Sequence, residues 1–267
     1  MNRQFLTDQI ASKKSMLCVG LDSDLDKIPA HLKDRPNGLV EFNKKIIDAT
    51  LEHCVSYKLN TAFYEALGAR GWDALEETCD YIPDTHFKIA DAKRADIGNT
   101  SHYYAKAFFE RLNFDAVTVA PYMGEDSVRP FLEYKDKWTI MLGLTSNAGA
   151  KDFELQTLST GEKLYERVLR TVSGWGDADN LMFVVGATQA SELSNIRQII
   201  PDHFLLVPGV GAQGGSLEEV IQFGKNANGG LLINASRAII YAGIEADFEE
   251  KVKEVAMGYH EEMRRMI

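Results

Sequence analysis

Short apolar runs alternate with longer segments of helical period along almost the whole chain. Eight of these runs have strand length and are rich in β-branched and other large apolar residues, which predicts β-strands. The segments between them repeat apolar residues every three to four positions, which predicts amphipathic helices. The predicted strands are residues 15–21, 55–60, 86–91, 116–120, 138–144, 181–187, 203–208 and 230–234.

The predicted helices follow the strands one by one, and those after the fourth and seventh strands are compact. Eight strands that are each followed by a helix predict a (β/α)8 TIM barrel, with an open doubly wound sheet as the alternative. We expect a single barrel domain over residues 1–267, with an N-terminal helix at 3–12 that packs against the barrel and an amphipathic helix at 247–266. The helices between the strands are predicted at 39–52, 72–81, 101–112, 126–134, 161–171, 190–200 and 217–225.

Chemically capable side chains gather where the predicted strands end. Asp22 follows the first strand, Asp91 ends the third, Ser146 follows the fifth and Arg237 follows the eighth. In a closed barrel these ends converge on one mouth, where barrel enzymes place their active sites, whereas an open sheet would spread them along a line. The positions of the polar residues therefore favour the barrel independently of the strand count.

The alternation of side chains along the second strand predicts which of them point into the barrel. Val55, Tyr57 and Leu59 share the face that meets the helices, which leaves Lys58 and Asn60 on the inner face. Charges that point into a barrel need partners or a function. Lys58 is thus a candidate for the active site.

The third strand carries two further charges on one face. A period of two places Phe87, Ile89, Asp91 and Lys93 together, so this face changes from apolar to ionised within a few residues, and Asp96 follows shortly after. Arg94 lies on the opposite face, where we expect a structural ion pair.

Lysines and aspartates that alternate in space stabilise one another's charged forms. Opposite charges ~4 Å apart attract by about 4 kcal/mol at an effective dielectric of 20. A carboxylate held in place opposes a substrate's own carboxylate, while a neighbouring ammonium favours a nearby carbanion and can protonate it. The array therefore suits decarboxylation without a metal or other cofactor.

A second group of residues predicts a phosphate site. The glycine-rich segment 208–215 follows the seventh strand, and Ser236 and Arg237 follow the eighth. Glycines let backbone N–H groups approach an anion, and arginine adds a bidentate fork. The segment is not a dinucleotide fingerprint, because Ser236 and Arg237 stand where that fingerprint has an acidic residue.

Composition limits the partners of the protein. The 267 residues carry a formal net charge of −10, so we expect neither nucleic acid nor an anionic membrane as a partner. The start of the chain is too polar for a signal peptide, and no apolar run approaches the ~20 residues of a membrane span. Three cysteines without metal-binding spacing fit a reducing compartment. We expect a cytoplasmic protein.

The decapeptide DAKRADIGNT at 91–100 resembles the signature of the orotidine 5′-phosphate decarboxylase family. Further blocks resemble the bacterial branch of that family with longer chains, and together they extend from residue 20 to residue 241. They are GLDSD at 20–24, KLNTAFYE at 58–65, PGVGAQGG at 208–215 and NASR at 234–237.

The resemblance implies a (β/α)8 barrel homodimer that converts orotidine 5′-phosphate (OMP) to UMP and CO2 in de novo pyrimidine biosynthesis, without metal or cofactor. It implies that Lys58, Asp91 and Lys93 form the charged array, that Asp91 faces the reacting carboxylate and that Lys93 protonates C6. It also implies that the partner subunit donates Asp96.

The same resemblance implies the residues that bind the substrate. Asp22 and Lys58 would hold ribose hydroxyls, and Ser146 would contact the pyrimidine edge. Ile97 and Thr100 of the partner would complete the pocket, which Asn60 and Met123 would help to wall. The phosphate would be bound by Gln213, Gly214 and Arg237.

Two alternatives to this function remain. A relative in the same superfamily that decarboxylates or condenses sugar phosphates also uses an Asp-x-Lys-x-x-Asp block, usually with Mg2+. Arg94, the segment 97–100 and Gln213 favour the pyrimidine enzyme. A catalytically silent phosphate-binding barrel is the other alternative, and it is disfavoured by the complete set of Lys58, Asp91, Lys93 and Asp96.

Overall fold

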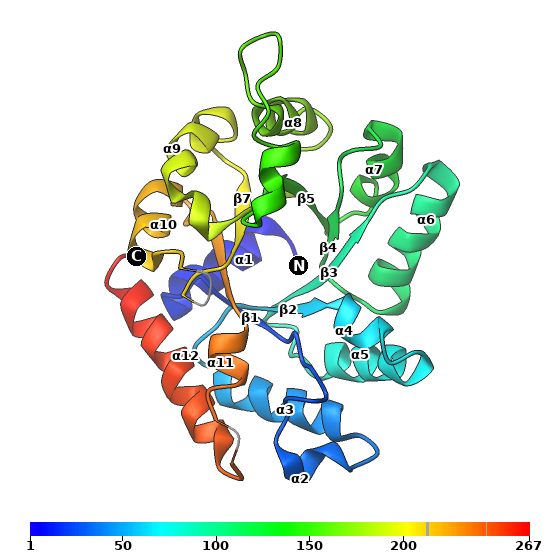
Figure 1. The fold of residues 1–267 in the computed structure, drawn as a ribbon, viewed down its shortest axis with the longest axis vertical. Helices are drawn as coiled ribbons and strands as arrows, with labels where there is room; N and C mark the ends of the chain where they lie inside the picture. The colour runs from blue at the N-terminus through cyan, green and yellow to red at the C-terminus, as the bar shows by residue number, and fades with distance from the viewer. Residues whose placement is uncertain (212–213, 244) are drawn as a thin grey trace.

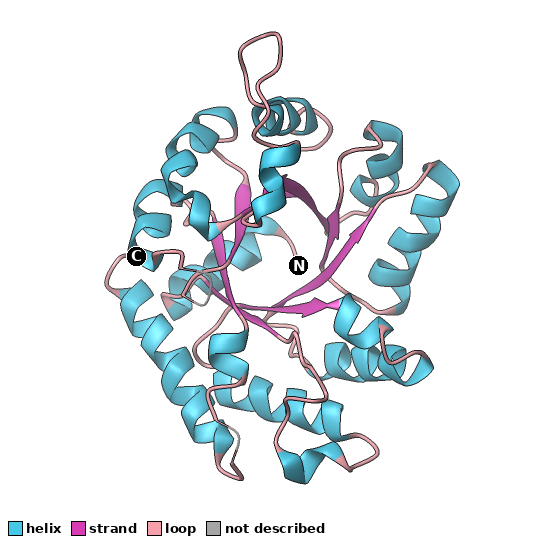
Figure 2. Ribbon diagram, in the orientation of Figure 1, coloured by secondary structure: helices cyan, strands magenta, loops and turns pink. Residues whose placement is uncertain are grey.

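A computed structural model of the chain, which describes residues 1–211, 214–243 and 245–267, contains a closed barrel of eight parallel strands (Figures 1 and 2). The strands pair in chain order from β1 to β8, and β8 returns to pair with β1. The predicted barrel and its eight predicted strands are confirmed, with ends that shift by up to three residues. The strands are β1 (Leu17–Gly20), β2 (Ser56–Asn60), β3 (Phe87–Arg94), β4 (Ala116–Val119), β5 (Trp138–Leu144), β6 (Leu181–Val185), β7 (Phe204–Pro208) and β8 (Leu231–Ala235).

Helices form a ring around the strands (Figure 2). Each predicted helix is present, although the segment predicted at 101–112 is an α-helix that continues into the π-helical turn Ala107–Arg111. The main helices are α1 (Arg3–Lys13), α3 (Gly38–Thr50), α5 (Ala69–Tyr81), α6 (Gly98–Lys106), α7 (Glu125–Leu132), α8 (Leu164–Val172), α9 (Ala190–Ile199), α10 (Leu217–Gly224) and α12 (Phe248–Arg264).

The helix prediction missed three α-helices of four or five residues. They are α2 (Ala30–Lys33), α4 (Thr61–Glu65) and α11 (Arg237–Ile240). Elements this short contain barely one helical turn, so no apolar period can develop in their sequence. Two of them, α4 and α11, directly follow strands and shape the mouth of the barrel.

Aromatic side chains and the N-terminal segment close the end of the barrel opposite the mouth. Phe87, Trp138 and Phe204 are the first residues of β3, β5 and β7, and the indole of Trp138 meets both other rings edge-on. The indole N–H of Trp138 donates to the carbonyl of Met1 at 2.8 Å, and Arg3 lies over the ring of Phe204. The N-terminus therefore lies within the ring of strands in Figure 1, and α1 packs against this end as predicted.

Strand β3 is irregular at its mouth end. Ala90 pairs with Val117 and Arg94 with Val119, so four residues of β3 advance along only two residues of β4. Lys93 lies in the left-handed region with φ 48°, which is uncommon for a residue with a side chain. We expected side chains to alternate regularly along β3 as far as Lys93, but the strand contains a bulge before its end. The bulge turns the side chain of Lys93 toward Asp91.

Candidate active site

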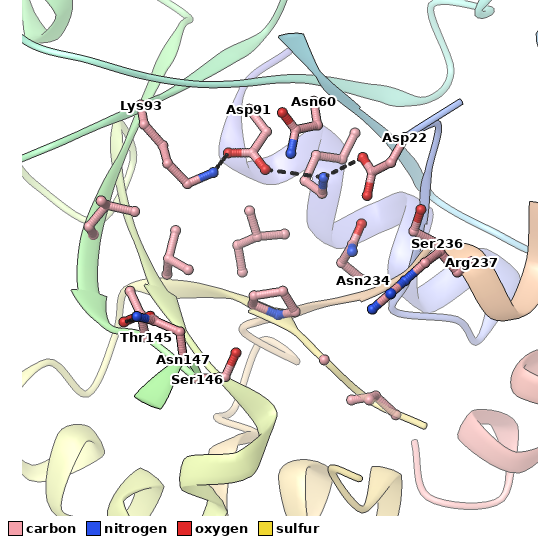
Figure 3. Close-up of a pocket in the computed structure, with 17 residues that line it drawn as sticks. Asp22, Asn60, Asp91, Lys93, Thr145, Ser146, Asn147, Asn234, Ser236 and Arg237 are labelled. Atoms are coloured by element: carbon pink, nitrogen blue, oxygen red, sulfur yellow. Dashed lines mark hydrogen bonds and ion pairs between the residues drawn. The ribbon is translucent and has the colours of Figure 1, made fainter. Parts of the chain in front are cut away.

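Four charged side chains form an ion-paired row at the mouth of the barrel (Figure 3). The Lys58 ammonium lies 3.0 Å from Oδ1 of Asp22 and 3.2 Å from Oδ2 of Asp91. The other oxygen of Asp91, Oδ1, accepts from the Lys93 ammonium at 2.6 Å. The row therefore runs Asp22, Lys58, Asp91, Lys93, with alternating charge.

The pairing of the first three strands brings these groups together. Gly20 is in register with Lys58, and Asn60 is in register with Asp91. On the outer face of β2, the Tyr57 hydroxyl hydrogen-bonds to Thr50 on α3 at 2.8 Å. Because side chains alternate along a strand, Lys58 points into the barrel, as the sequence predicted.

The charges of the row hold one another in the ionised state. Burial works to raise the pKa of Asp91, but the Lys58 and Lys93 ammonium groups outweigh it and lower this pKa to about 2. Burial works to lower the pKa of Lys58, and Asp22 and Asp91 reverse this effect and raise it. An ionised carboxylate and an ionised ammonium are therefore in place at neutral pH.

Thr118 on β4 contacts two members of the row, and sequence reasoning did not single it out. Its hydroxyl donates to Oδ1 of Asp91 at 3.0 Å and accepts from the backbone N–H of Lys93 at 2.9 Å. The side chain is fully buried. The only signal available in the sequence was a hydroxyl at an inward position of an otherwise apolar strand.

The pocket has a charged half and an apolar half. Asp22, Lys58 and Asp91 come from the first three strands. The opposing wall, from β5 to β7 and the segment that follows β7, is made of Leu142, Val184, Leu206, Pro208 and Val210. A planar ring with polar edges and an ionised substituent would fit this pocket, with the ring against the apolar half and the substituent toward the charged half.

The segment after β5 supplies polar groups at the rim of the apolar half. Thr145, Ser146 and Asn147 line the pocket and face the charged row across it (Figure 3). Glu154 holds this segment, because its carboxylate accepts from the Thr145 N–H at 2.7 Å and from the Thr145 hydroxyl at 2.9 Å. Ser146, a predicted site residue, thus lines the pocket.

Two glycines allow strand ends to pack closely around the mouth. A Cβ at Gly186 would lie 2.6 Å from Cβ of Ser146 and 2.7 Å from its backbone nitrogen. A Cβ at Gly20 would lie 2.7 Å from Cβ of Ser236, whose hydroxyl donates to the Gly20 carbonyl at 2.9 Å. Side chains at these two positions would displace pocket-lining residues.

Of the three residues predicted to bind phosphate, only Arg237 is found to line the pocket among the described residues. Arg237 lines the pocket together with Gly209 and Ser236, at the end away from Lys93 (Figure 3). Gly214 does not line it, and Gln213 lies outside the described residues. An arginine at this end remains suited to an anion.

Besides Gly214, four predicted site residues do not line the pocket of their own barrel. Asn60 lines it, but Asp96, Ile97, Thr100 and Met123 do not. Ile97 is 64% exposed and Met123 is 47% exposed, so both present apolar surface outside the barrel. Both side chains are therefore accessible at the surface.

Arg94 has the structural role expected for it. Its guanidinium pairs with Glu65 and lies over the rings of Tyr104 and Phe108 on the outside of the barrel. The bulge of β3 therefore sends Lys93 and Arg94 to different environments.

Asn234 and Asn147 line the pocket and were absent from the predicted site. Asn234 is buried on β8, and its Oδ1 has no hydrogen-bond partner among the described residues. The NASR block contains Asn234, but a carboxamide at a strand end has no distinctive spacing by which it could be recognised.

Two features of the described part of the chain concern metals and membranes. No three His, Cys, Asp or Glu side chains of these residues are grouped as a metal site would require. Within the same ranges, no helix is long and apolar enough to cross a membrane.

Comparison with known proteins identifies the family. The model of the family described as "Orotidine 5′-phosphate decarboxylase / HUMPS family" matches residues 15–254. An orotidine 5′-phosphate decarboxylase of Flavobacterium johnsoniae is 59% identical over 271 residues, covering 100% of this chain and 98% of the relative. One of Bacteroides fragilis is 53% identical over 270 residues, with coverage of 100% and 98%.

The fold agrees with solved structures of the same family. The structure of Leishmania donovani OMP decarboxylase superposes with a TM-score of 0.85 at 36% identity, covering 98% of this chain and 97% of that one. The chain therefore belongs to the orotidine 5′-phosphate decarboxylase / HUMPS family.

Proposed function

We propose that the row of Asp22, Lys58, Asp91 and Lys93 carries out the decarboxylation of OMP to UMP and CO2. The chain is an orotidine 5′-phosphate decarboxylase of pyrimidine biosynthesis, and the residue roles are the proposal. The observation that carries it is the ion-paired row beside an apolar wall, because charges are fixed on one side of a space that accepts a ring.

The reaction breaks the bond between C6 and the carboxyl carbon. The electron pair of that bond stays on C6 in the plane of the ring, so it cannot delocalise into the π system. Stabilisation must then be local and electrostatic, which an ordered ammonium supplies. Lys93 donates a proton from its ammonium to C6, and CO2 departs as a neutral product.

Asp91 faces the reacting carboxylate in this scheme. Lys58 and Lys93 keep Asp91 ionised, and each ammonium pairs with one of its two oxygens, so a second negative charge beside it is opposed. Loss of CO2 removes the charge that Asp91 opposes. The row thereby favours the transition state over the bound substrate.

The rest of the pocket positions the nucleotide. In this proposal Asp22 and Lys58 bind ribose hydroxyls and Arg237 binds the phosphate; all three residues line the pocket. The ring would lie against Leu142 and Val184, with Ser146 at its polar edge. We also propose that Gln213 and Gly214 complete the phosphate site and that Asn60 and Met123 help to wall the pocket, with Met123 acting from outside its own barrel.

We further propose a homodimer in which Asp96, Ile97 and Thr100 enter the partner's site. None of the three lines the pocket of its own barrel. Ile97 directly precedes α6 and Tyr103 lies on it, and each is 64% exposed. Tyr122 is 93% exposed in the segment before α7. Apolar surface of this kind on adjacent elements is typical of a protein interface.

The identities of the relatives favour OMP over a sugar phosphate as the substrate, since the relatives from F. johnsoniae and B. fragilis are both orotidine 5′-phosphate decarboxylases. We propose that the reaction needs no metal or cofactor. The purified protein should therefore deplete OMP absorbance at an unchanged rate in EDTA, measured against the same protein supplied with Mg2+. Complete inhibition by EDTA that Mg2+ reverses would contradict a metal-free reaction.

We infer a cytoplasmic location from the same function. The thiols of Cys18, Cys54 and Cys79 are buried and unpaired, as expected for a reducing compartment. Cell fractionation with an antibody against the protein would test this inference.

A further inference from the structure

We propose that Thr118 is a positioning residue of the reaction, whose hydroxyl fixes both the carboxylate of Asp91 and the backbone of Lys93. The inference rests on the proposed roles of Asp91 and Lys93. It adds a residue from β4, a strand that contributes none of the ion-paired row.

A single hydroxyl makes both contacts in a consistent direction. The O–H of Thr118 donates to Oδ1 of Asp91 at 3.0 Å, and the oxygen accepts from the Lys93 N–H at 2.9 Å. The side chain is fully buried, so water does not compete for either bond. The hydroxyl therefore uses its one donor and one of its two acceptor positions on the two residues proposed to carry out the chemistry.

The contact lies where β3 departs from regular pairing. Between Ala90 and Arg94 the register with β4 shifts, and Lys93 takes φ 48°. A regular strand would bond the Lys93 N–H to a backbone carbonyl, and here the side chain of Thr118 replaces that partner. The hydroxyl thus stabilises the bulge that directs the Lys93 ammonium to Asp91.

The same bond restricts Asp91. Lys58 and Lys93 are ammonium groups on flexible chains, which can follow a rotating carboxylate, whereas Thr118 has a short β-branched side chain on a barrel strand. Its bond therefore fixes the direction of Oδ1. Without this bond, the Asp91 carboxylate could rotate when the substrate's carboxylate arrives. Part of the repulsion between the two carboxylates would then be lost.

Thr118→Val tests this inference, because valine keeps the shape and removes both bonds. A hydrogen bond to a charged group is lost, so we expect kcat to fall by roughly 10- to 100-fold. The KM for OMP and the Kd of UMP should change little, since the ribose and phosphate contacts lie elsewhere in the pocket. The acid limb of kcat should move to higher pH, because the Asp91 carboxylate loses a donor.

Thr139→Val is the matched control. Thr139 lies on β5, is buried, and its hydroxyl has no partner among the described residues. It is in register with Val117, the residue before Thr118. T139V should keep the wild-type kcat and pH profile. Thr118→Ser keeps the hydroxyl and should restore most of the activity lost in T118V.

The outcomes separate this inference from the proposed function. Wild-type protein that does not decarboxylate OMP would refute the function itself. An active wild type with a T118V variant that matches T139V in kcat and acid limb would refute the role of Thr118 alone, as would a T118S variant as slow as T118V. If T118V does not fold, Thr118→Cys, whose thiol is a weak donor, should show the same loss of kcat, and wild-type kcat in T118C would refute the role.

Discussion

Lys58 keeps its charge inside the barrel because two carboxylates share it. Asp22 and Asp91 lie within 3.2 Å of its ammonium, and only 4% of the lysine side chain is exposed. Removing one partner of a buried ion pair typically costs about 3–5 kcal/mol, because the remaining charge stays buried. The row is therefore coupled, and a change at one residue alters the others.

This coupling predicts the pH dependence of the reaction. The pKa of Asp91 is lowered to about 2, so the carboxylate is ionised at every pH above about 4. We expect kcat, measured with saturating OMP, to lack an acid limb above pH 5. A limb in kcat centred between pH 5 and 7 in the wild type that disappears in Asp91→Asn would contradict this prediction.

Stability should follow the same titration. A carboxyl with a lowered folded-state pKa stabilises the fold above its unfolded pKa of about 3.9, and this contribution is lost as the pH falls toward 2. Urea unfolding should therefore show the stability difference between wild type and Asp91→Asn changing between about pH 4 and 2 and constant above pH 5.

At the residue scale, the sequence predicted charge better than it predicted neutral polar contacts. The sequence reveals Lys58, Asp91 and Lys93 because burying an ionised group at an inward position of an apolar strand is costly unless the group is paired or functional. Thr118 and Asn234 carry no charge, and threonine and asparagine occur on strand ends for many reasons. Their importance depends on distances across strands that are far apart in sequence, which no local pattern reveals.

At the scale of elements, the end of β6 supports the segment after β5. Gly186 leaves no space for a side chain beside Ser146, and Glu154 holds Thr145 from the other side. Ser146 is thereby fixed between two elements, although it lies in a loop. Its position depends on the packing of these elements.

Gly186→Ala should displace Ser146 without unfolding the barrel. The added Cβ would lie 2.6–2.7 Å from Ser146 atoms, which must move. We expect kcat/KM for OMP to fall by about 10-fold or more, as is common when a positioned group is displaced. Gly258→Ala in α12 is the matched control, since its Cβ meets nothing within 4 Å, and it should leave the kinetics unchanged. Wild-type kinetics in G186A would contradict the role of this contact.

The strands were predicted more completely than the elements that shape the mouth. Eight apolar runs suffice to predict the strands, whereas α4 and α11 are too short to show a period. The bulge in β3 was also not predictable, because it arises from pairing with β4, and the sequence around Lys93 contains no glycine to indicate a left-handed residue.

At the scale of the whole molecule, the proposed shared site predicts complementation between subunits. Lys93→Ala and Asp96→Ala homodimers should each be nearly inactive, since each site lacks one residue. In a mixed dimer, one site lacks both residues and the other regains both. Mixing the two proteins under conditions that allow subunit exchange should therefore restore part of the activity.

The control for this experiment mixes Lys93→Ala with Lys93→Ala Asp96→Ala chains, which cannot form a complete site. Native mass spectrometry should first show that subunits exchange. Mixed dimers without any recovered activity would place Asp96 outside the partner's site.

The aromatic closure of the barrel floor constrains the order of product release. Phe87, Trp138 and Phe204 fill the end opposite the mouth, where the N-terminal segment covers them. Carbon dioxide formed beside Asp91 must then leave through the opening that admitted the nucleotide. The gas is small and uncharged, and in the proposed binding mode the nucleotide lies along the pocket, so we expect CO2 to leave before UMP. With Lys93 as the proposed proton donor, protonation of C6 removes the carbanion that could otherwise recapture CO2.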